Sequence, residues 1–421
     1  MIIGKGSETE FLSERDIYDL CAEAFEKKAL DGKRVLLVLP DYTRSGPFDL
    51  MFRTVYRLLA GRVKLLDFLI ALGTHPPMTD EQIYRMLDIT EKQHHSEFPK
   101  ARFFNHNCQN PDELRLAGTF GEDEIAEISN SLMRRKVNVK INRRIYDYDL
   151  LLLVGPTFPH EAMGFSGGHK YLFPGICGEE IIDTFHWIGA LITIPVFIGT
   201  KDTPMRRLVE KAATFIPVER MCLNLVVKGR DLSGLYIGPP EETFQAAADL
   251  SDRIHIIYED RPYKTVLSCA PPMYDEIWTA GKCMYKLESV VADGGELIIY
   301  APHVNRLSDV YGKQLETIGY HCRDYFVNQW DRFKDIQGGV LAHSCNVRGI
   351  GTFENGIEHP RITVTLATTM SEDYCRSINL NYRDPASIDP ADYSGREAEG
   401  VLHVPKAGEM LYLLRNNPFR T

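Results

Sequence analysis

Residues 159–187, PHEAMGFSGGHKYLFPGICGEEIIDTFHW, contain the features around which the rest of the chain is organised. They place His160, Lys170 and His186 around a glycine-rich turn at 164–168. The apolar run 149–154 (DLLLLV) just upstream is typical of a strand buried on both faces, so His160 is predicted in the loop beyond that strand. Two acidic residues, followed by apolar residues at helical spacing, predict a helix that begins near residue 178 and carries His186.

Each of these features alone has an ordinary structural explanation. Glycine is common wherever the backbone takes a positive φ angle, and a single histidine is more often structural than a ligand. The ordered combination of two histidines, a lysine and the segment GFSGGHKYLFPGI is more specific and indicates a functional site.

Length and composition limit the class of protein. With 421 residues, the chain is long enough for two or three domains, each with its own core. A hydrophobic content of 44% and a charged content of 25% are those of an ordinary globular protein. The formal net charge of -10 argues against a nucleic-acid-binding surface, which needs clustered lysine and arginine. A local basic pocket for a small anionic substrate is compatible with this charge.

The nine cysteines are scattered and contain no C-x-x-C pair, which argues against a zinc ribbon or a disulfide framework and favours a reducing compartment. The N-terminal residues MIIGKGSETEF lack the apolar segment of a signal peptide, and the longest apolar run, 188–198, is too short to cross a bilayer. We therefore expect a cytoplasmic protein without a membrane anchor.

Strands and helices are predicted to alternate before the central stretch. The predicted helices are 16–27 and 51–60, and the predicted buried strands are 34–39 and 63–72. Asp41 and Arg44 follow the first of these strands, and His75 follows the second. Because open α/β sheets bind ligands at the carboxyl ends of their strands, these side chains and His160 are expected on one rim. A capping box of Thr79 and Gln82 predicts a further helix through residue 87.

Strands and helices are also predicted beyond residue 200. The prediction comprises helices at 204–213 and 241–252, a strand at 221–227, a β-α-β series at 264–269, 275–292 and 296–300, a strand at 361–367, and a turn-rich tail at 382–421. The β-α-β series has the length of a crossover unit, so we place a domain boundary between residues 250 and 262. The expected domains are 1–255 and 256–421.

Several other residues favour structural roles. His94 and His95 lie in the charged segment EKQHHSEF, which is typical of a solvated face. His106 and Cys108 have no partner pair at metal-ligand spacing, so we interpret them as loop residues. The aromatic residues of 324–335 are expected to serve packing.

Four motifs together resemble those of the nickel-dependent lactate racemase family, in the same order. They are DYTR at 41–44, GTHPPMTDE at 73–81, the stretch 159–178 with His186 behind it, and Lys282 in the second domain. The resemblance covers roughly residues 34–300. It implies an α/β fold of two α/β domains with parallel sheets and an active site in the interdomain cleft.

The same resemblance implies an unusual cofactor, a pyridinium-3,5-bisthiocarboxylic acid mononucleotide that carries nickel in a pincer of sulfur, carbon and sulfur donors. Lys170 would hold this nickel pincer nucleotide covalently, and His186 would complete the coordination of the metal, for which imidazole is a suitable ligand. Asp41 would orient Arg44 or contact the cofactor. The turn of Ser166, Gly167 and Gly168, with the helix that follows it, is suited to the cofactor phosphate by general anion-binding logic.

The implied reaction is the inversion of C2 of a 2-hydroxy acid by transient hydride transfer. A base removes the hydroxyl proton while the hydrogen on C2 leaves as hydride, and return to the other face inverts the centre. Two bases are then needed, and His75 and His160 match the pair of the family. Arg44 and Lys282 would bind the substrate carboxylate.

The substrate pocket departs from the family pattern. Trp278 and Thr279 stand where lactate enzymes tend to have Tyr-Gln, so a larger polar acid, such as a sugar acid of the gluconate/mannonate type, is the favoured substrate. His303 and Asn305 are candidates for contacts with its hydroxyl groups. Lactate and malate remain alternatives within the family. The expected partners are this small acid and the enzymes that assemble the cofactor, without nucleic acid or membrane.

Two readings from other classes remain open. A zinc-dependent hydrolase or lyase could use His75, His160 and His186, although no H-x-x-x-H or H-x-H pair occurs and Lys170 would have no role. A non-catalytic carrier of the nickel nucleotide would need Lys170 and His186 but not the two bases. Separate substitution of the two pairs distinguishes a carrier from an epimerase.

Overall fold

The structure is a computed structural model that describes residues 1–420. By its internal packing the chain forms two compact units that interleave along the sequence. The first unit consists of Met1–Phe158, Phe165–Ile182 and Arg206–Ile254, and the second of Pro159–Gly164, Asp183–Met205 and His255–Thr421. The division expected from the sequence, 1–255 and 256–421, assigns both central excursions to the first domain, whereas their packing assigns them to the second unit.

The first unit is built on a seven-stranded sheet in the order β1-β11-β10-β7-β2-β3-β4. All neighbours from β10 to β4 run parallel, while β11 pairs antiparallel with both β10 and β1. The buried strands predicted before residue 230 are confirmed. The strands are β1 (Ile3–Gly6), β2 (Arg34–Pro40), β3 (Leu65–Ala71), β4 (Arg102–Asn105), β7 (Leu150–Pro156), β10 (Glu219–Lys228) and β11 (Asp231–Gly238), with a separate hairpin of β5 (Leu114–Phe120) and β6 (Val137–Asn142).

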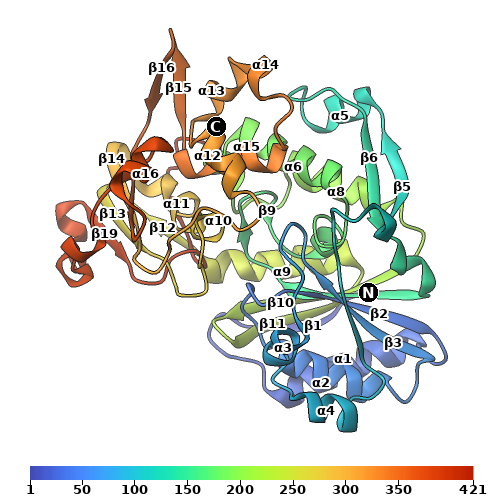
Figure 1. Ribbon diagram of the computed structural model, residues 1–421. Coiled ribbons are helices and arrows are strands. Elements are labelled where there is room, and N and C mark those ends of the chain that lie inside the picture. Colours follow the sequence, from blue (N-terminus) through green and yellow to red (C-terminus); the bar gives the residue numbers. More distant parts are fainter. Residues whose placement is uncertain (421) are drawn as a thin grey trace. The chain divides into compact units, whose positions relative to one another are not determined.

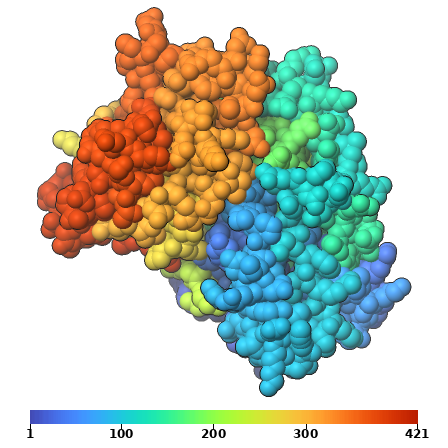
Figure 2. All heavy atoms as spheres, in the orientation of Figure 1, coloured from blue at the N-terminus to red at the C-terminus, as the bar shows by residue number. Residues whose placement is uncertain are grey.

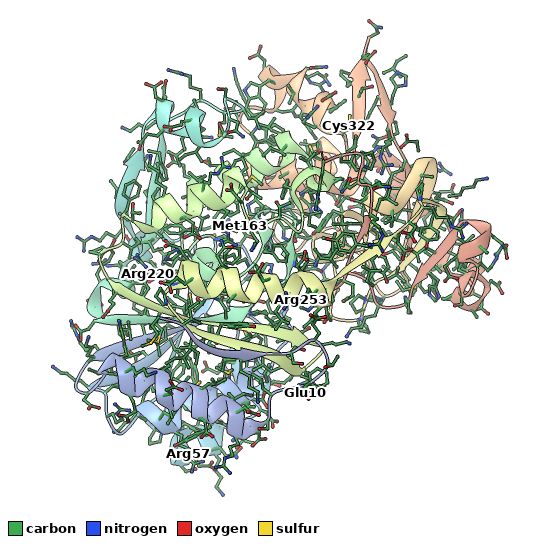
Figure 3. All side chains as sticks on the ribbon, turned by 180° about the vertical axis from the view of Figure 1, so that it is seen from behind. Glu10, Arg57, Met163, Arg220, Arg253 and Cys322 are labelled. Atoms are coloured by element: carbon green, nitrogen blue, oxygen red, sulfur yellow. The ribbon has the colours of Figure 1, made fainter. Side chains whose placement is uncertain are left out.

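Helices cover both faces of this sheet (Figures 1 and 3). On one face, alternate strand residues such as Val35 and Leu37 pack with Phe25 and Phe52 of α1 and α2 in one core cluster. On the other face, Leu250 of α9 packs against Val226. Burial on both faces explains why the strands are continuous apolar runs. The helices are α1 (Glu14–Lys28), α2 (Phe48–Leu59), α3 (Asp80–Met86), α4 (Glu91–Glu97), α5 (Glu122–Ile128), α8 (Pro204–Ala213) and α9 (Pro240–His255).

The predicted capping box at the start of α3 is confirmed. The hydroxyl of Thr79 accepts a hydrogen bond from the backbone N–H of Gln82 at 3.2 Å, and the Gln82 side chain accepts one from the Thr79 N–H at 2.8 Å. Two of the N–H groups that a helix N-terminus leaves without partners are satisfied in this way.

The strand order of the first unit creates a switch point between β2 and β7. From β2 the sheet grows through β3 and β4 on one side, and through β7 and β10 on the other. Loops that leave the carboxyl ends of β2 and β7 diverge here, and open parallel sheets bind their ligands at such points. Asp41 directly follows β2, and the glycine-rich turn lies beyond β7, so a ligand-binding site is expected at this part of the sheet.

The second unit contains a five-stranded parallel sheet in the order β18-β17-β14-β13-β19. The strands predicted at 264–269, 296–300 and 361–367 are confirmed as β13, β14 and β17. The tail expected to be turn-rich also supplies strands, since β19 joins this sheet and β20 pairs with β12. The strands of this part are β12 (Ile256–Glu259), β13 (Tyr263–Cys269), β14 (Val291–Ala301), β15 (Gly351–Glu354), β16 (Ile357–Pro360), β17 (Thr363–Thr368), β18 (Asn381–Tyr382), β19 (Val401–Val404) and β20 (Leu411–Leu414).

The single helix predicted at 275–292 is wrong. The segment contains the short helices α10 (Ile277–Ala280) and α11 (Lys282–Tyr285) and a 3-10 turn, and β14 already begins at Val291. Between the two helices, a side-chain carbon on Gly281 would lie 3.0 Å from Val347 and 3.1 Å from His343 of α15. Tertiary packing against α15 therefore overrides the helical spacing of the apolar residues.

The other helices of the chain include α6, which begins after residue 178 as predicted and carries His186. The aromatic residues of 324–335 serve packing as expected, because Tyr325 and Phe326 pack on Phe333, and Trp330 stacks on Trp187 at 5.6 Å between ring centroids. These helices are α6 (Glu179–Ile192), α7 (Ile194–Phe197), α12 (Gly312–Ile318), α13 (Arg323–Val327), α14 (Trp330–Phe333), α15 (Gly338–Arg348) and α16 (Glu372–Ser377).

The surface and the cysteines show few special features. Most residues of 389–399 are exposed, and this segment forms part of the red surface in Figure 2. All nine cysteines are buried and free, so the fold of residues 1–420 does not rely on disulfides. Within those residues, no helix has the length and apolar character needed to span a membrane.

Candidate functional site

His75 and Asp41 form a hydrogen-bonded pair beyond the carboxyl ends of the neighbouring strands β3 and β2. Nδ1 of His75 lies 2.5 Å from Oδ2 of Asp41, which is 3% exposed. Oδ1 of Asp41 accepts hydrogen bonds from the backbone N–H and the hydroxyl of Thr43, at 2.9 and 2.5 Å. Both carboxylate oxygens are thus bonded to protein groups. Asp41 therefore orients His75, a role that the sequence did not reveal.

The charges around this pair favour an ionised Asp41. Burial opposes its negative charge, but His75, Arg44 and the Thr43 hydrogen bond hold the pKa of the Asp41 carboxyl well below its usual range. Arg44 reaches the pair through Thr43, with Nη1 at 3.2 Å from the hydroxyl oxygen. An ionised Asp41 accepts a hydrogen bond from Nδ1–H of His75, which leaves Nε2 as the nitrogen with a free lone pair in the neutral ring.

The glycine-rich turn is held by its own hydrogen bonds. Gly167 and Gly168 have φ angles of 95° and 60°, a conformation that residues with a side chain rarely adopt. The hydroxyl of Ser166 donates to the carbonyl of Pro156 at 2.8 Å, and the N–H of Gly168 donates to Asn224 Oδ1 at 2.9 Å. These donors, which the sequence analysis assigned to a cofactor phosphate, are therefore occupied by the protein itself.

Lys170 follows this turn in a 3-10 helix that spans Gly168–Tyr171. It is 8% exposed, and its Nζ lies 5.7 Å from the centroid of the Tyr171 ring. Lys170 thus lies buried beside the turn, in the first unit.

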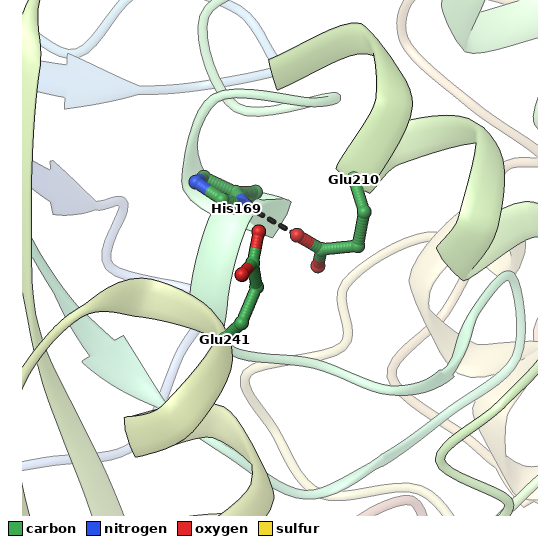
Figure 4. Close-up of side chains that lie close together, drawn as sticks. All are labelled: His169, Glu210 and Glu241. Carbon is green, nitrogen blue, oxygen red and sulfur yellow. Dashed lines mark hydrogen bonds and ion pairs between the residues drawn. The ribbon is translucent and has the colours of Figure 1, made fainter. Parts of the chain in front are cut away.

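His169, the residue that follows the turn, lies close to Glu210 and Glu241 (Figure 4). One ligand atom of each lies within 4.8 Å of the others, so the group has the spacing of a metal site. However, Nδ1 of His169 is already 2.5 Å from a carboxylate oxygen of Glu210, and Glu210 also pairs with Arg206 at 3.4 Å. Arg206 in turn donates to the carbonyl of Gly167 at 3.1 Å. The group therefore braces the turn, and none of the three histidines of the zinc hypothesis belongs to it.

His160 lies in the second unit, in the two-residue strand β8 (Pro159–His160), which is followed by β9 (Gly164–Phe165). It is 5% exposed, and its Nδ1 accepts a hydrogen bond from the N–H of Ala162 at 3.1 Å. Oε2 of Glu161 lies 3.8 Å from the same nitrogen. A carboxylate thus lies beside His160 as well, although at a distance longer than a hydrogen bond.

Lys282 of α11 is also in the second unit. It is 9% exposed, and its Nζ lies 4.7 Å from the centroid of the Tyr274 ring. Burial opposes the charge of Glu161, but His160, Lys282 and Lys286 hold the pKa of the Glu161 carboxyl well below its usual range. The second unit therefore brings together a histidine, a carboxylate and a cation.

Trp278 and Thr279 precede Lys282 in the sequence by four and three residues. The Trp278 ring packs on His343 and Tyr311, at 4.5 and 4.7 Å between centroids, and the Thr279 hydroxyl donates to the carbonyl of Glu276 at 3.0 Å. His303 and Asn305 are exposed, and Nε2 of His303 lies 3.0 Å from the carbonyl oxygen of Tyr274.

The remaining histidines divide into one candidate ligand and several structural residues. His186 is half-buried on α6, with its ring 4.4 Å from that of Phe185. His106 is fully buried between the carbonyl of Cys177 and the side chain of Asn142, and burial lowers its pKa to about 4. His94 bonds to the carbonyl of Ala101 at 2.8 Å. His106 was predicted to be a loop residue, and the structure shows it as a buried, neutral residue of the core.

Four residues of these clusters were not identified as site residues from the sequence: Glu161, His169, Lys286 and His343. Glu161 directly follows His160, so its position alone could have drawn attention to it. Lys286 is 1% exposed, and lysine is so rarely buried that its neighbours in the sequence do not predict this burial. His343 comes from α15, and only the fold brings it to Trp278.

Comparison with known proteins gives consistent results. A family model described as the lactate racemase N-terminal domain matches residues 19–193. The curated lactate racemase of Thermoanaerobacterium thermosaccharolyticum is 23% identical over 310 residues, which cover 70% of this chain and 67% of that protein. A crystal structure of a Thermotoga maritima protein is 34% identical and has a TM-score of 0.89, covering 98% of this chain and 100% of the other. The lactate racemase apoprotein of T. thermosaccharolyticum shares the fold, with a TM-score of 0.70 at 18% identity over 96% of this chain and 93% of the other.

Proposed function

Since the chain belongs to the lactate racemase family, we propose that it is a racemase or epimerase that inverts C2 of a 2-hydroxy acid. The observation that best supports the proposal is the bond between Asp41 and His75, with Arg44 beside it. A histidine oriented by a buried carboxylate is suited to general acid–base catalysis, and an adjacent arginine is suited to a substrate carboxylate. The first unit thus has a base and a cation of the kinds that the reaction needs.

The two histidines exchange protons with the substrate hydroxyl in this proposal. Asp41 holds the proton on Nδ1 of His75, so Nε2 takes the hydroxyl proton of one enantiomer and returns it in the reverse direction. His160 does the same for the other enantiomer, because inversion needs a base for each hand. Arg44 and Lys282 bind the carboxylate, as a two-pronged donor and as a point charge respectively.

The residues present fit the cofactor that the resemblance implies. Lys170 offers a buried amine for a covalent thioamide, and His186 offers an imidazole for nickel. When bound, the nickel pincer nucleotide supplies a hydride acceptor. Ser166, Gly167 and Gly168 then act by holding the turn that presents Lys170, since their described donors bond to the protein.

We further propose a substrate larger and more polar than lactate, with an aldonic acid of the gluconate/mannonate type first. The support is Trp278, whose ring packs on His343 and Tyr311, together with the ionised carboxylate of Glu161, which faces Lys282 in the same unit. A methyl group gains nothing from an ionised carboxylate in its pocket, whereas hydroxyl groups can donate to it.

The experiment is to produce the chain together with cofactor-assembly enzymes and to record its intact mass and nickel content. Lys170→Ala is the control. A covalent mass increment with stoichiometric nickel, absent from the control, is expected. The loaded protein is then assayed on lactate, malate and gluconate by polarimetry. Bound zinc without a covalent increment would instead support a hydrolase or lyase. Loading without turnover of any 2-hydroxy acid would support a carrier.

A further inference from the structure

We propose that Glu161 is the positioning residue of His160: its carboxylate accepts a hydrogen bond from Nδ1–H and so sets the imidazole as a base at Nε2. The inference rests on the proposed function, because it concerns the second of the two bases. Asp41 has this relation to His75 in the first unit, and Glu161 would have it in the second.

The geometry around Nδ1 of His160 allows two arrangements. In the structure Nδ1 accepts the N–H of Ala162 at 3.1 Å, so the proton of the neutral ring is on Nε2. A ring in that tautomer can donate a proton from Nε2 but cannot accept one there. The base form needs its proton on Nδ1, where Ala162 can no longer donate to it.

The carboxylate of Glu161 is in position to accept a hydrogen bond from that Nδ1–H. Its Oε2 lies 3.8 Å from Nδ1, and a side-chain movement of about 1 Å would bring it to the distance of a charge-assisted hydrogen bond. The two side chains are only 7% and 17% exposed, so water screens their interaction little. Protonation of Nδ1 thus exchanges the backbone N–H of Ala162 for the carboxylate of Glu161 as the partner of this nitrogen, with a shift of the ring or of residue 162 that separates the two N–H groups.

The surroundings of Glu161 favour its ionised form. Its own backbone N–H is among the groups that stabilise its charge. The charged groups that face it are His160, Lys282 and Lys286, and Lys286 donates to the carbonyl of Glu409 at 3.0 Å. Burial lowers the pKa of the neighbouring His343 to about 3, so His343 is neutral near pH 7. Glu161 is thus an ionised carboxylate beside the ring nitrogen.

The proton transfer balances without a further reactant. The O–H bond of the substrate breaks and leaves its electron pair on oxygen, while Nε2 of His160 uses its lone pair to form the new N–H bond. The ring becomes an imidazolium, and its Nδ1–H donates to Glu161, whose negative charge stabilises it. In the reverse direction the same proton returns to the substrate oxygen.

The test is a histidine titration by nitrogen NMR on the protein without cofactor, with His160→Gln used to assign the signal. Glu161→Gln is expected to lower the pH midpoint of His160 by about one unit and to reduce the fraction of the Nδ1–H tautomer. Glu161→Asp keeps the charge and should recover most of both effects. Glu358→Gln is the matched control, because Glu358 faces His321 at 3.0 Å in the same unit and should move His321 but not His160.

In the loaded enzyme, Glu161→Gln should reduce kcat about 10- to 100-fold with little change in KM, and shift the basic group of the pH profile. Unchanged His160 signals in Glu161→Gln, with the thermal unfolding of the protein intact, would overturn the pairing. If the loaded wild-type protein turns over no 2-hydroxy acid, the proposed function and the catalytic role of the pair fail together. The NMR titration would still report whether the pair exists.

Discussion

The two units each supply a histidine, a carboxylate and a cation, but they assemble them differently. In the first unit, Asp41 bonds His75 at 2.5 Å and is itself held by Thr43. In the second unit, Glu161 lies 3.8 Å from His160, whose Nδ1 is occupied by a backbone N–H. In the proposed function the first pair is already set for proton acceptance, and the second needs a change of tautomer. Under that proposal, a fixed and an adjustable carboxylate prepare the two histidines for the same task.

Removal of the fixed carboxylate should have the largest effect. Asp41→Asn leaves the shape of the pair but supplies an amide that can donate to Nδ1, which places the proton of His75 on the wrong nitrogen. We expect kcat/KM to fall about a thousand-fold, in both directions of the reaction. The measurement is steady-state racemisation by the loaded enzyme, with cofactor content checked by intact mass. A loss smaller than that of Glu161→Gln would reverse the ranking of the two pairs.

Removal of either cation should have a smaller effect on the reaction than removal of the Asp41 carboxylate. Arg44→Gln removes a two-pronged donor from the first unit, and Lys282→Gln removes a point charge from the second. Each is expected to raise KM about 10- to 100-fold, since a hydrogen bond to a charged group contributes about 1.5–3 kcal/mol. Comparison of KM and kcat for both variants is the measurement. An effect confined to kcat would place the residue in proton transfer and not in substrate binding.

His106 sharpens the comparison, because it is a buried histidine without a carboxylate partner. Its folded-state pKa of about 4 is below the ordinary 6.5, so the unfolded chain binds more protons between these values. Stability therefore falls as the pH decreases from about 6.5 towards 4. His106→Gln, which does not titrate, should reduce the loss of unfolding free energy between pH 7 and pH 5 by about 2 kcal/mol. Urea unfolding at the two pH values measures it, and equal slopes for variant and wild type would contradict it.

The smallest expected effect concerns the residue that holds Asp41. Thr43→Val keeps the shape of the side chain and the backbone hydrogen bond to Asp41, but it removes the hydroxyl that Asp41 accepts and that Arg44 donates to. Because the backbone N–H of Thr43 still donates to Asp41, we expect a net cost of only about 1 kcal/mol, so kcat/KM should fall about five-fold. The same substitution should leave the His160 titration unchanged. A response of His160 would show that the two pairs are coupled.

Local patterns in the sequence were sufficient for most of the fold. The buried strands β2, β3 and β7 were visible as apolar runs because a parallel sheet covered on both faces needs no alternation of polar residues. Helices with clear caps, such as α3, were equally visible. The segment 275–292 was mispredicted because its apolar spacing suits a helix, while the fit of Gly281 against α15 depends on residues far along the chain.

The site was predictable in its residues but not in its contacts. Asp41 and His75 could each be placed after a strand, yet their bond depends on β2 and β3 being neighbours in the sheet. The hydroxyl of Ser166 looked available to a phosphate, because sequence does not show which backbone carbonyl a hydroxyl meets. The assignment of His160 and His186 to the second unit was hidden for a similar reason, since short excursions carry no signal of the unit on which they pack.

The interleaving of the chain also bears on how the protein is made. Residues 159–164 and 183–205 leave the ribosome before residues 255–421, on which they pack, have been synthesised. Until then their apolar side chains, such as Trp187 and Ile188, lack their final partners, and a chain cut near residue 255 would lack them permanently. His160 and His186 would therefore reach their final packing only once the last part of the chain has emerged.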